Sequence, residues 1–273
     1  MFKIISKKML AANIFEMKIE APLVAKSASS GQFIILRIDE FGERIPLTVA
    51  DSDSSSVTVV FLVVGHSTEQ LSKLEVGDFI LDFVGPLGNK SEINNFGTVV
   101  LVGGGCGVAP VFPQARDFKK AGNKVIIIAG FRSKDLVFWE DKLREVCDEL
   151  IITTDDGSYG RKGFAAHALK EIIDKENVDR VIIVGPPIMM KFTSLITKEK
   201  NIPTIVSINS IMVDGMGMCG ACRVVVDGKT RFACVDGPEF DASKVDFDEL
   251  MNRNSTYLDE EKAVTEKNHK VCY

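Results

Sequence analysis

Short apolar runs alternate with turn residues over about the first 95 positions of the chain. The runs are "FKII", "IFEMKIE", "GQFIILRI", "VTVVFLVV" and "FILDFVG", and Ser, Gly and Asp are common between them, most clearly in the loop "DSDSSS" at 51–56. Each run has the length of one strand, and the polar separators are typical of an antiparallel sheet. We therefore predict a small antiparallel β-barrel or β-sandwich over residues 1–96.

The pattern changes at about residue 97 to an alternation of buried strands and helices. "TVVLVGGG", "KVIIIAGF", "ELIITT" and "DRVIIVGP" are almost continuously apolar, and a helical pattern such as "VAPVFPQARDFKKAG" or "DLVFWEDKLREVC" follows them. Strands buried on both faces belong to parallel sheets covered by helices. We predict a parallel α/β domain over residues 97–206.

The remaining residues form a third region with weak periodicity. Residues 207–240 contain a group of cysteines, and residues 241–273 are highly charged with a helical pattern. The predicted fold is therefore β + α/β, followed by a small C-terminal module with a helical tail over residues 207–273.

Composition narrows the classes of function. The 273 residues are 45% hydrophobic and 26% charged, and the net charge of −5 gives no electrostatic reason to expect nucleic acid as a partner. Residues 96–115 carry no charge, but five glycines and two prolines interrupt them, so we do not expect a membrane span. The start "MFKIISKKML" is a poor signal peptide, and we expect a cytoplasmic protein.

A glycine-rich loop between a strand and a helix is the first candidate binding site. It lies in "VVLVGGGCGVAP" at 99–110, and its candidate residues are Gly104, Gly105, Cys106, Gly107 and Val108. Glycines allow a pyrophosphate to approach the backbone, and a helix N-terminus supplies N–H donors. The spacing departs from G-x-G-x-x-G, so a tight turn without a ligand remains an alternative.

Further loops follow the other predicted parallel strands, where ligands of open α/β sheets gather. They are "AGFRS", "TTDDGSYGRKG" and "VGPPIMM". Their candidate residues are Arg132, Asp155, Asp156, Gly185, Pro186 and Met189. The carboxylates of Asp155 and Asp156 would repel a 2′-phosphate, which favours NAD(H) over NADP(H), whereas Arg132 and the cations of "GRKG" act against this preference.

Two stretches of the N-terminal region have polar residues beside a strand. "ERIPLTVA" at 43–50 places an arginine and a threonine at a strand entrance, and "VVGHSTEQLSKL" at 63–74 runs from a strand into a helix. Ser67 or Thr68 can cap that helix, which leaves N–H groups for an anion. Ordinary capping is the alternative.

The order of these domains, joined by "GPLG" at 85–88, resembles the ferredoxin–NADP⁺ reductase superfamily over about residues 1–205. "RIPLT", "GGGCGVAP" and "VGPPIMM" carry the resemblance. It implies FAD on the barrel, NAD(P) on the second domain, and hydride transfer between nicotinamide and flavin N5 near Thr48. The FAD residues it implies are Arg44, Pro46, Leu47, Thr48, Val64, Gly65, Ser67 and Thr68. Leu47 replaces the family's tyrosine, and Arg44 lies one residue further from Thr48 than usual.

Three of the six cysteines cluster in the third region. Asp214, Cys219, Cys222 and Cys234 are spaced D-x₄-C-x₂-C-x₁₁-C. The first three positions have the offsets of a plant-type [2Fe–2S] loop, C-x₄-C-x₂-C, with Asp214 in the first cysteine position. A zinc site is one alternative. In another, Asp214 caps the turn and an outside ligand completes the site.

The whole arrangement resembles electron-transfer subunits that carry a C-terminal [2Fe–2S] loop, such as the subunit that serves dihydroorotate dehydrogenase. The aspartate version, "IMVDGMGMCGACRV", resembles the small subunits of electron-bifurcating transhydrogenases. This implies a heterodimer or larger assembly whose other subunit carries FAD and [4Fe–4S] clusters and reacts with NADPH and ferredoxin. Service to a dihydroorotate dehydrogenase, a hydrogenase or a sulfide dehydrogenase is the alternative. A non-catalytic nucleotide sensor with a zinc loop is a third hypothesis.

Overall fold

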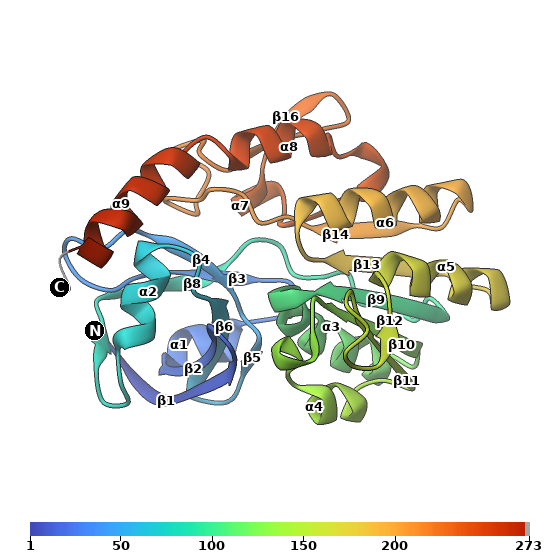
Figure 1. The fold of residues 1–273 in the computed structure, drawn as a ribbon, viewed down its shortest axis with the longest axis horizontal. Helices are drawn as coiled ribbons and strands as arrows, with labels where there is room; N and C mark the ends of the chain where they lie inside the picture. The colour runs from blue at the N-terminus through green and yellow to red at the C-terminus, as the bar shows by residue number, and fades with distance from the viewer. Residues whose placement is uncertain (271–273) are drawn as a thin grey trace.

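The computed structural model describes the backbone of residues 1–270 and the side chains of residues 1–264. Figure 1 shows antiparallel sheets at one end of the molecule and an α/β domain at the other. The C-terminal segment crosses above both, from the α/β domain back to the N-terminal sheets.

The N-terminal region contains two antiparallel sheets. One has the order β5-β6-β2-β1-β7, and the other has the order β4-β3-β8. Their bounds are β1 Phe2–Ala11, β2 Ile14–Glu20, β3 Phe33–Arg37, β4 Ile45–Thr48, β5 Asp51–Ser52, β6 Ser56–Leu62, β7 Phe79–Ile80 and β8 Asp82–Leu87, with helices α1 Pro22–Ser27 and α2 His66–Lys73. Ile34 and Leu36 of β3 share a fully buried core with Val57 and Val59 of β6. The expected antiparallel sheets are present, but the described strand pairs do not close into one barrel.

The α/β domain is built on a seven-stranded sheet of order β12-β11-β10-β9-β13-β14-β17. The strands are β9 Thr98–Gly104, β10 Lys124–Phe131, β11 Glu149–Thr154, β12 Arg161–Lys162, β13 Arg180–Val184, β14 Thr204–Ser207 and β17 Glu239–Asp241. All pairs are parallel except β14 with β17. Strand β17 therefore brings the third predicted domain into the sheet of the second.

Helices cover both faces of this sheet, which explains its continuous apolar strands. Helices α3 Val108–Lys120 and α4 Glu140–Glu145 pack with Val99 and Leu101, and helices α5 Ala165–Lys175 and α6 Pro187–Glu199 pack with Val100 and Val102. The charge-free stretch 96–115 thus contains β9, the short helix η1 Gly105–Gly107 and the start of α3. No helix among the described residues combines the length and apolar character that crossing a membrane requires.

The helix predicted from "DLVFWEDKLREVC" is shorter than expected. It begins as the single turn η2 Lys134–Leu136, and α4 starts only after Trp139, whose φ of 59° is left-handed. The Trp139 ring packs against Phe112 and Phe138, and its Nε1 donates to Glu16 of β2 at 2.9 Å. The contacts of the indole thus favour a non-helical backbone at Trp139, and the predicted helix does not continue through this residue.

The C-terminal segment is a hairpin followed by short helices. Its elements are β15 Arg223–Val226, β16 Lys229–Phe232, α7 Ala233–Asp236, β17, η3 Ala242–Lys244, α8 Phe247–Asn254 and α9 Leu258–Lys270. Helix α9 lies beside α2 of the N-terminal region (Figure 1). The predicted helical tail is confirmed through residue 270, and residues 271–273 lie outside the described chain.

Candidate cofactor sites and cysteine loop

Asp214 organises the backbone of the cysteine loop. Its Oδ1 accepts the Met216 N–H at 2.9 Å, and its Oδ2 accepts the N–H groups of Met218 at 3.0 Å and Cys219 at 2.7 Å. These N–H donors, of which Met216 has the largest effect, hold the pKa of Asp214 below its ordinary value. A carboxylate has about four lone-pair positions, so this capping leaves one for another partner.

The loop is seated against the N-terminal sheets. Gly215, Gly217 and Gly220 all have left-handed φ angles, of 75°, 82° and 68°. A Cβ on Gly215 would lie 2.7 Å from side-chain carbons of Ile35 on β3 and Leu87 on β8. The backbone of the loop therefore lies directly on the three-stranded sheet.

The three cysteines differ in exposure. Cys222 and Cys234 are buried, and the Cys234 N–H donates to the Cys222 sulfur at 3.4 Å. Burial, followed by the hydrogen bond and charge interaction with Cys222, raises the pKa of the Cys234 thiol to about 12. Cys219 is exposed, and its sulfur accepts the Ala221 N–H at 3.5 Å. Hydrogen bonds to sulfur are a feature of iron–sulfur sites.

The described side chains contain no group of three His, Cys, Asp or Glu residues already arranged around one metal position. The predicted ligands nevertheless lie on one loop and on α7, the short helix that follows the adjoining β15–β16 hairpin. Three sulfurs and a carboxylate oxygen fit ferric iron, and they also fit zinc. The chemistry of the donor set therefore suits a metal site, and other observations must decide which metal it takes.

The glycine loop lies where the strand order of the α/β sheet reverses. The chain leaves β9 toward α3 on one face and leaves the neighbouring β13 toward α6 on the other, which is where such sheets bind ligands. A Cβ on Gly107 would collide with the Val184 carbonyl, and one on Gly104 would collide with the Met189 sulfur. These two glycines allow the β9 and β13 loops to pack together.

Gly105 has a different position. Its φ is 54°, and a Cβ there would meet no atom within 4 Å. The loop is therefore open at Gly105 and leads into the N-terminus of the 13-residue helix α3. Burial raises the pKa of the neighbouring Cys106 thiol to about 11, so it is a neutral thiol at ordinary pH. Pro186 is the N-cap of α6, and Gly185 precedes it.

The structure brings Arg132, Asp155 and Asp156 together at the ends of β10 and β11. The Asp155 N–H donates to the Phe131 carbonyl at 3.0 Å, and the Asp156 N–H donates to the Arg132 carbonyl at 3.2 Å. The Asp156 carboxylate accepts both the hydroxyl of Ser158 at 2.7 Å and its N–H at 2.9 Å. These bonds lower the pKa of Asp156 and fix a negative charge at this edge.

The predicted flavin residues gather around β4 and the start of α2. Pro46, Leu47 and Thr48 are half-buried on β4, which pairs with β3. The Ser67 hydroxyl of α2 donates to Glu43 at 2.7 Å and so joins the helix to the loop that carries Arg44. The Arg44 guanidinium lies 4.0 Å from Asp82.

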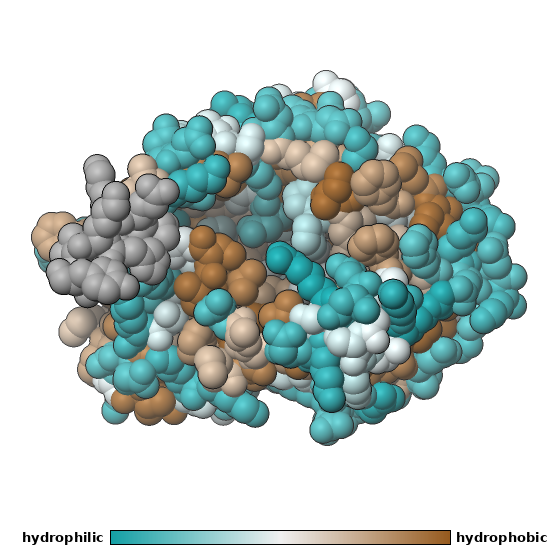
Figure 2. Space-filling model, in the orientation of Figure 1, coloured by the Kyte–Doolittle hydropathy of each residue, from teal (hydrophilic) through white to brown (hydrophobic). Residues whose placement is uncertain are grey.

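Thr68 has the capping role that the sequence left open. Its Oγ1 accepts the N–H groups of Val64 at 3.0 Å and Gly65 at 3.2 Å. Val64 is 76% exposed, and Gly65 is the N-cap of α2. In the orientation of Figure 1, Figure 2 shows a recess between the C-terminal segment and the two other regions of the chain.

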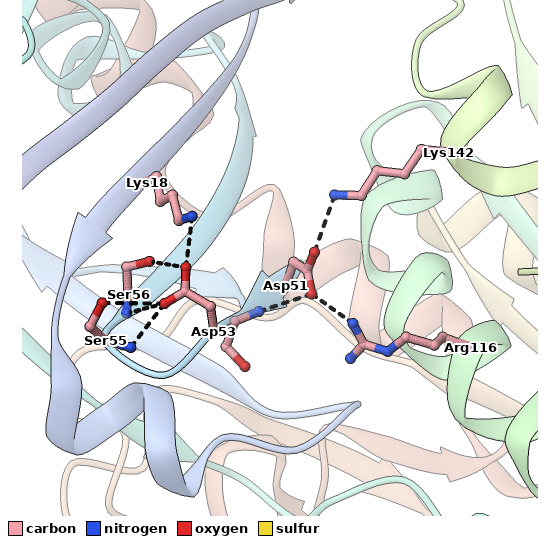
Figure 3. A network of polar contacts seen from close by, with 8 residues as sticks. Lys18, Asp51, Asp53, Ser55, Ser56, Arg116 and Lys142 are labelled. Carbon is pink, nitrogen blue, oxygen red and sulfur yellow. Dashed lines mark hydrogen bonds and ion pairs between the residues drawn. The ribbon is translucent and has the colours of Figure 1, made fainter. Parts of the chain in front are cut away.

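Sequence reasoning missed the contacts that join the two larger domains. Asp51 of β5 accepts the Arg116 Nη1 of α3 at 2.7 Å, and it lies 3.4 Å from Lys142 Nζ of α4 (Figure 3). Asp53 forms a neighbouring cluster with Lys18, Ser55 and Ser56. No sequence signal marks the Asp51 pairs, because charged residues far apart in the chain carry no pattern that relates them.

Comparison with known proteins adds two family matches. Residues 209–246 match the iron-sulfur cluster binding domain of dihydroorotate dehydrogenase B. Residues 101–195 match the oxidoreductase NAD-binding domain. The first match contains Asp214 and all three clustered cysteines, and the second contains the glycine loop and the β13 loop.

Full-length relatives extend the match over nearly the whole chain. A Thermotoga maritima homologue of the electron-transfer subunit of dihydroorotate dehydrogenase B (NAD⁺) is 48% identical, over 97% of this chain and 94% of its own. The Fusobacterium nucleatum electron-transfer subunit is 34% identical, over 88% and 95%. The chain belongs to this family of electron-transfer subunits. The family assignment confirms the predicted resemblance.

A solved structure matches within the same family. A chain from the structure of NADH-dependent reduced ferredoxin–NADP oxidoreductase, described in work on flavin-based electron bifurcation, is 47% identical. It covers 97% of this chain and 96% of its own length with a TM-score of 0.92. The electron-transfer subunit described here therefore shares its fold over all three regions.

Proposed function

We propose that the chain is a flavin and iron–sulfur electron-transfer subunit of an electron-bifurcating NADH-dependent ferredoxin:NADP⁺ oxidoreductase. The near-complete match to the solved enzyme of that name carries the proposal. The cysteine loop supports it, because Asp214 replaces the first cysteine, as the resemblance to bifurcating transhydrogenases implies.

FAD would bind on the N-terminal sheets, which we infer to act as the superfamily's flavin barrel. Arg44, Thr48 and the start of α2 at Ser67 are the polar groups available there. Thr48 lies on β4, paired with Phe33 of β3. Because Gly215 packs on the same β3, a flavin near β4 would lie close to the cysteine loop.

NAD(H) would bind across the β9 and β13 loops. The open backbone at Gly105 and the N-terminus of α3 suit the pyrophosphate. The fixed negative charge of Asp156, beside Asp155, disfavours a 2′-phosphate, which supports NAD(H) as the nucleotide.

Asp214, Cys219, Cys222 and Cys234 would hold a [2Fe–2S] cluster. The carboxylate of Asp214 has a lone-pair position left after its three N–H bonds, so it can cap the loop and ligate iron together. The family model for iron–sulfur binding over 209–246 favours this cluster over zinc.

With FAD and the cluster held by these residues, the bound groups would supply the conversion of a two-electron hydride donor, NADH, into a source of single electrons. The residual proton passes to solvent. One NADH therefore requires two one-electron transfers to an acceptor outside this chain. A larger partner with FAD and [4Fe–4S] clusters, linked to NADPH and ferredoxin, would supply that acceptor. Reduced cysteine ligands suit a cytoplasmic location.

A spectrum of the anaerobically purified chain tests the cofactor proposal. Flavin bands with a broad iron–sulfur absorption, both bleached by NADH, are the expected result. A colourless protein that contains stoichiometric zinc would contradict it.

Service to a dihydroorotate dehydrogenase is the second candidate, favoured by the similarity to the Thermotoga maritima and Fusobacterium nucleatum proteins. Copurification of the natural partner decides between the two. Reduction of the complex by NADPH together with reduced ferredoxin supports the first function, whereas reduction by dihydroorotate supports the second.

A further inference from the structure

The start of β17 is a junction at which all three regions of the chain meet. Glu239, the first residue of β17, accepts the Ser91 hydroxyl and the Gln114 Nε2 on the same carboxylate oxygen, each at 2.6 Å. Gln114 Nε2 also lies 3.3 Å from the Ser91 hydroxyl. Ser91 belongs to the linker after β8, and Gln114 belongs to α3 of the α/β domain.

The N-terminal region approaches the same point. The Ser91 N–H donates to the Ser30 carbonyl at 2.8 Å. Gly31 has a φ of 84°, and a Cβ there would collide with the Ser91 hydroxyl and lie 2.8 Å from the Glu239 carboxylate. Ser91 and Gln114 are 7% and 1% exposed and Glu239 is half-buried, so solvent reaches the junction only from the Glu239 side.

The junction is directly connected to the cysteine loop. Cys234 lies on α7, which leads through Gly237 and Pro238 to Glu239. Asn89 of the linker holds this short connection, because its N–H donates to the Gly237 carbonyl at 2.7 Å and its Nδ2 donates to the Val235 carbonyl at 3.1 Å. The position of Cys234 therefore depends on contacts between this connection and the linker.

We propose that Glu239 is a positioning residue for electron transfer, which fixes the cluster loop against the linker and α3 through Ser91 and Gln114. The inference rests on the proposed function and deepens it. Its physical basis is that the rate of electron transfer falls as the distance between donor and acceptor grows, so a cluster loop that is held less firmly would be reduced more slowly. Truncation of Glu239 would also enlarge an adjoining cavity of about 180 Å³ lined by Ser91, Gln114 and Arg180.

The test compares four cofactor-loaded full-length proteins: wild type, Glu239→Ala, Glu239→Gln and the control Asp241→Ala. Asp241 lies on the same strand, but its carboxylate caps a surface turn at Ser243. Rapid mixing with NADH follows flavin bleaching and cluster reduction separately. Hydrogen–deuterium exchange follows the segments 213–222 and 233–241.

For Glu239→Ala we expect cluster reduction to slow about tenfold relative to flavin reduction, together with faster exchange in 233–241. Glu239→Gln should restore both, because its carbonyl oxygen can accept the same two hydrogen bonds, and Asp241→Ala should match wild type. Unchanged exchange and an unchanged ratio of the two rates in Glu239→Ala would overturn the inference. An effect of equal size in Asp241→Ala would do the same.

If Glu239→Ala does not fold, the same measurements are made on Ser91→Ala, which removes one of the two donors to Glu239. A wild-type ratio of the two rates together with wild-type exchange in Ser91→Ala would overturn the inference. Failure of the proposed function has a separate signature. In that case NADH does not reduce the cluster of the wild-type protein.

Discussion

At the residue scale, the Asp214 carboxylate caps the cysteine loop, and it could fill its predicted ligand role at the same time. Three N–H donors use its oxygens, and a lone-pair position remains for iron. The sequence spacing alone predicted a ligand or a cap as alternatives. The structure shows the cap, and the ligand role stays a prediction.

Substitution of Asp214 separates these roles. We expect Asp214→Cys to assemble a [2Fe–2S] cluster with an altered electron paramagnetic resonance spectrum, because a thiolate supplies the ligand found in plant-type loops. Asp214→Ala removes both ligand and cap and should lose the cluster. The measurement is iron content with the spectrum of the reduced protein. An unchanged spectrum in Asp214→Ala would show that the carboxylate is not a ligand.

We predict that individual residues also decide the choice between NAD(H) and NADP(H). Replacement of Asp155 and Asp156 by serine removes two negative charges beside Arg132. We expect the ratio of kcat/KM for NADPH to that for NADH to rise about tenfold, which corresponds to about 1.4 kcal/mol. Steady-state flavin reduction with each nucleotide measures it. Asp259→Ser, on the surface of α9, is the control, and an equal change in both proteins would contradict the assignment.

At the element scale, the contact of β5 with α3 and α4 depends on Asp51. Burial would lower the pKa of Arg116, but the hydrogen bond and charge of Asp51 outweigh it and raise that pKa. The pair is about one-third exposed on each side, so solvent screens it only in part.

We expect Asp51→Asn to lower the free energy of unfolding by about 1 kcal/mol, because it removes the charge that Arg116 and Lys142 share. Chemical denaturation of the loaded protein, followed by circular dichroism and flavin release, measures the change. Lys262→Ala disrupts the exposed pair with Asp259 and should change the midpoint little. Equal shifts in both variants would show that Asp51 has no special role in joining the domains.

The sequence predicted individual elements better than the contacts between them. Continuous Val and Ile runs identified β9, β10 and β13, because strands covered on both faces need such residues. The predicted helix around Trp139 was too long. The backbone of Trp139 is left-handed instead of helical, and its indole donates a hydrogen bond to Glu16. Strand β17 has only three residues and pairs with β14 more than 30 positions earlier, so no local pattern could reveal it.

At the scale of the whole molecule, the same limit applies to the junction around Glu239. Ser91 and Gln114 lie 148 and 125 positions away from it in the sequence. The candidate binding loops could be predicted from glycines and cysteines because each motif is local. The residue that connects the three regions has no motif.

The junction should also influence how stability depends on pH. Burial raises the pKa of Glu239 above its ordinary value of 4.5, and the Ser91 hydrogen bond and the Arg180 charge oppose this only in part. A raised carboxyl pKa contributes stability at low pH that is lost as the pH rises through the folded value. We expect the melting temperature of wild type relative to Glu239→Gln to fall as pH rises above about 4.5.

Asp53 provides the opposite control. Lys18 and the neighbouring serines hold its pKa well below the ordinary range, so its contribution is lost as pH falls. Melting curves of Asp53→Asn and Glu239→Gln across the acidic to neutral range should therefore diverge from wild type in opposite directions. A pH-independent difference between Glu239→Gln and wild type would show that this carboxyl titrates normally.

The antiparallel pairing of β17 with β14 predicts how the protein behaves when the chain is truncated before β17. Without β17, the backbone of Thr204–Ser207 would be an open edge, with unpaired N–H and carbonyl groups available to another molecule. A shortened chain that ends before the cysteine loop would therefore tend to self-associate through this edge. In the intact chain β17 covers this edge, so the C-terminal module and the α/β sheet form one structural unit.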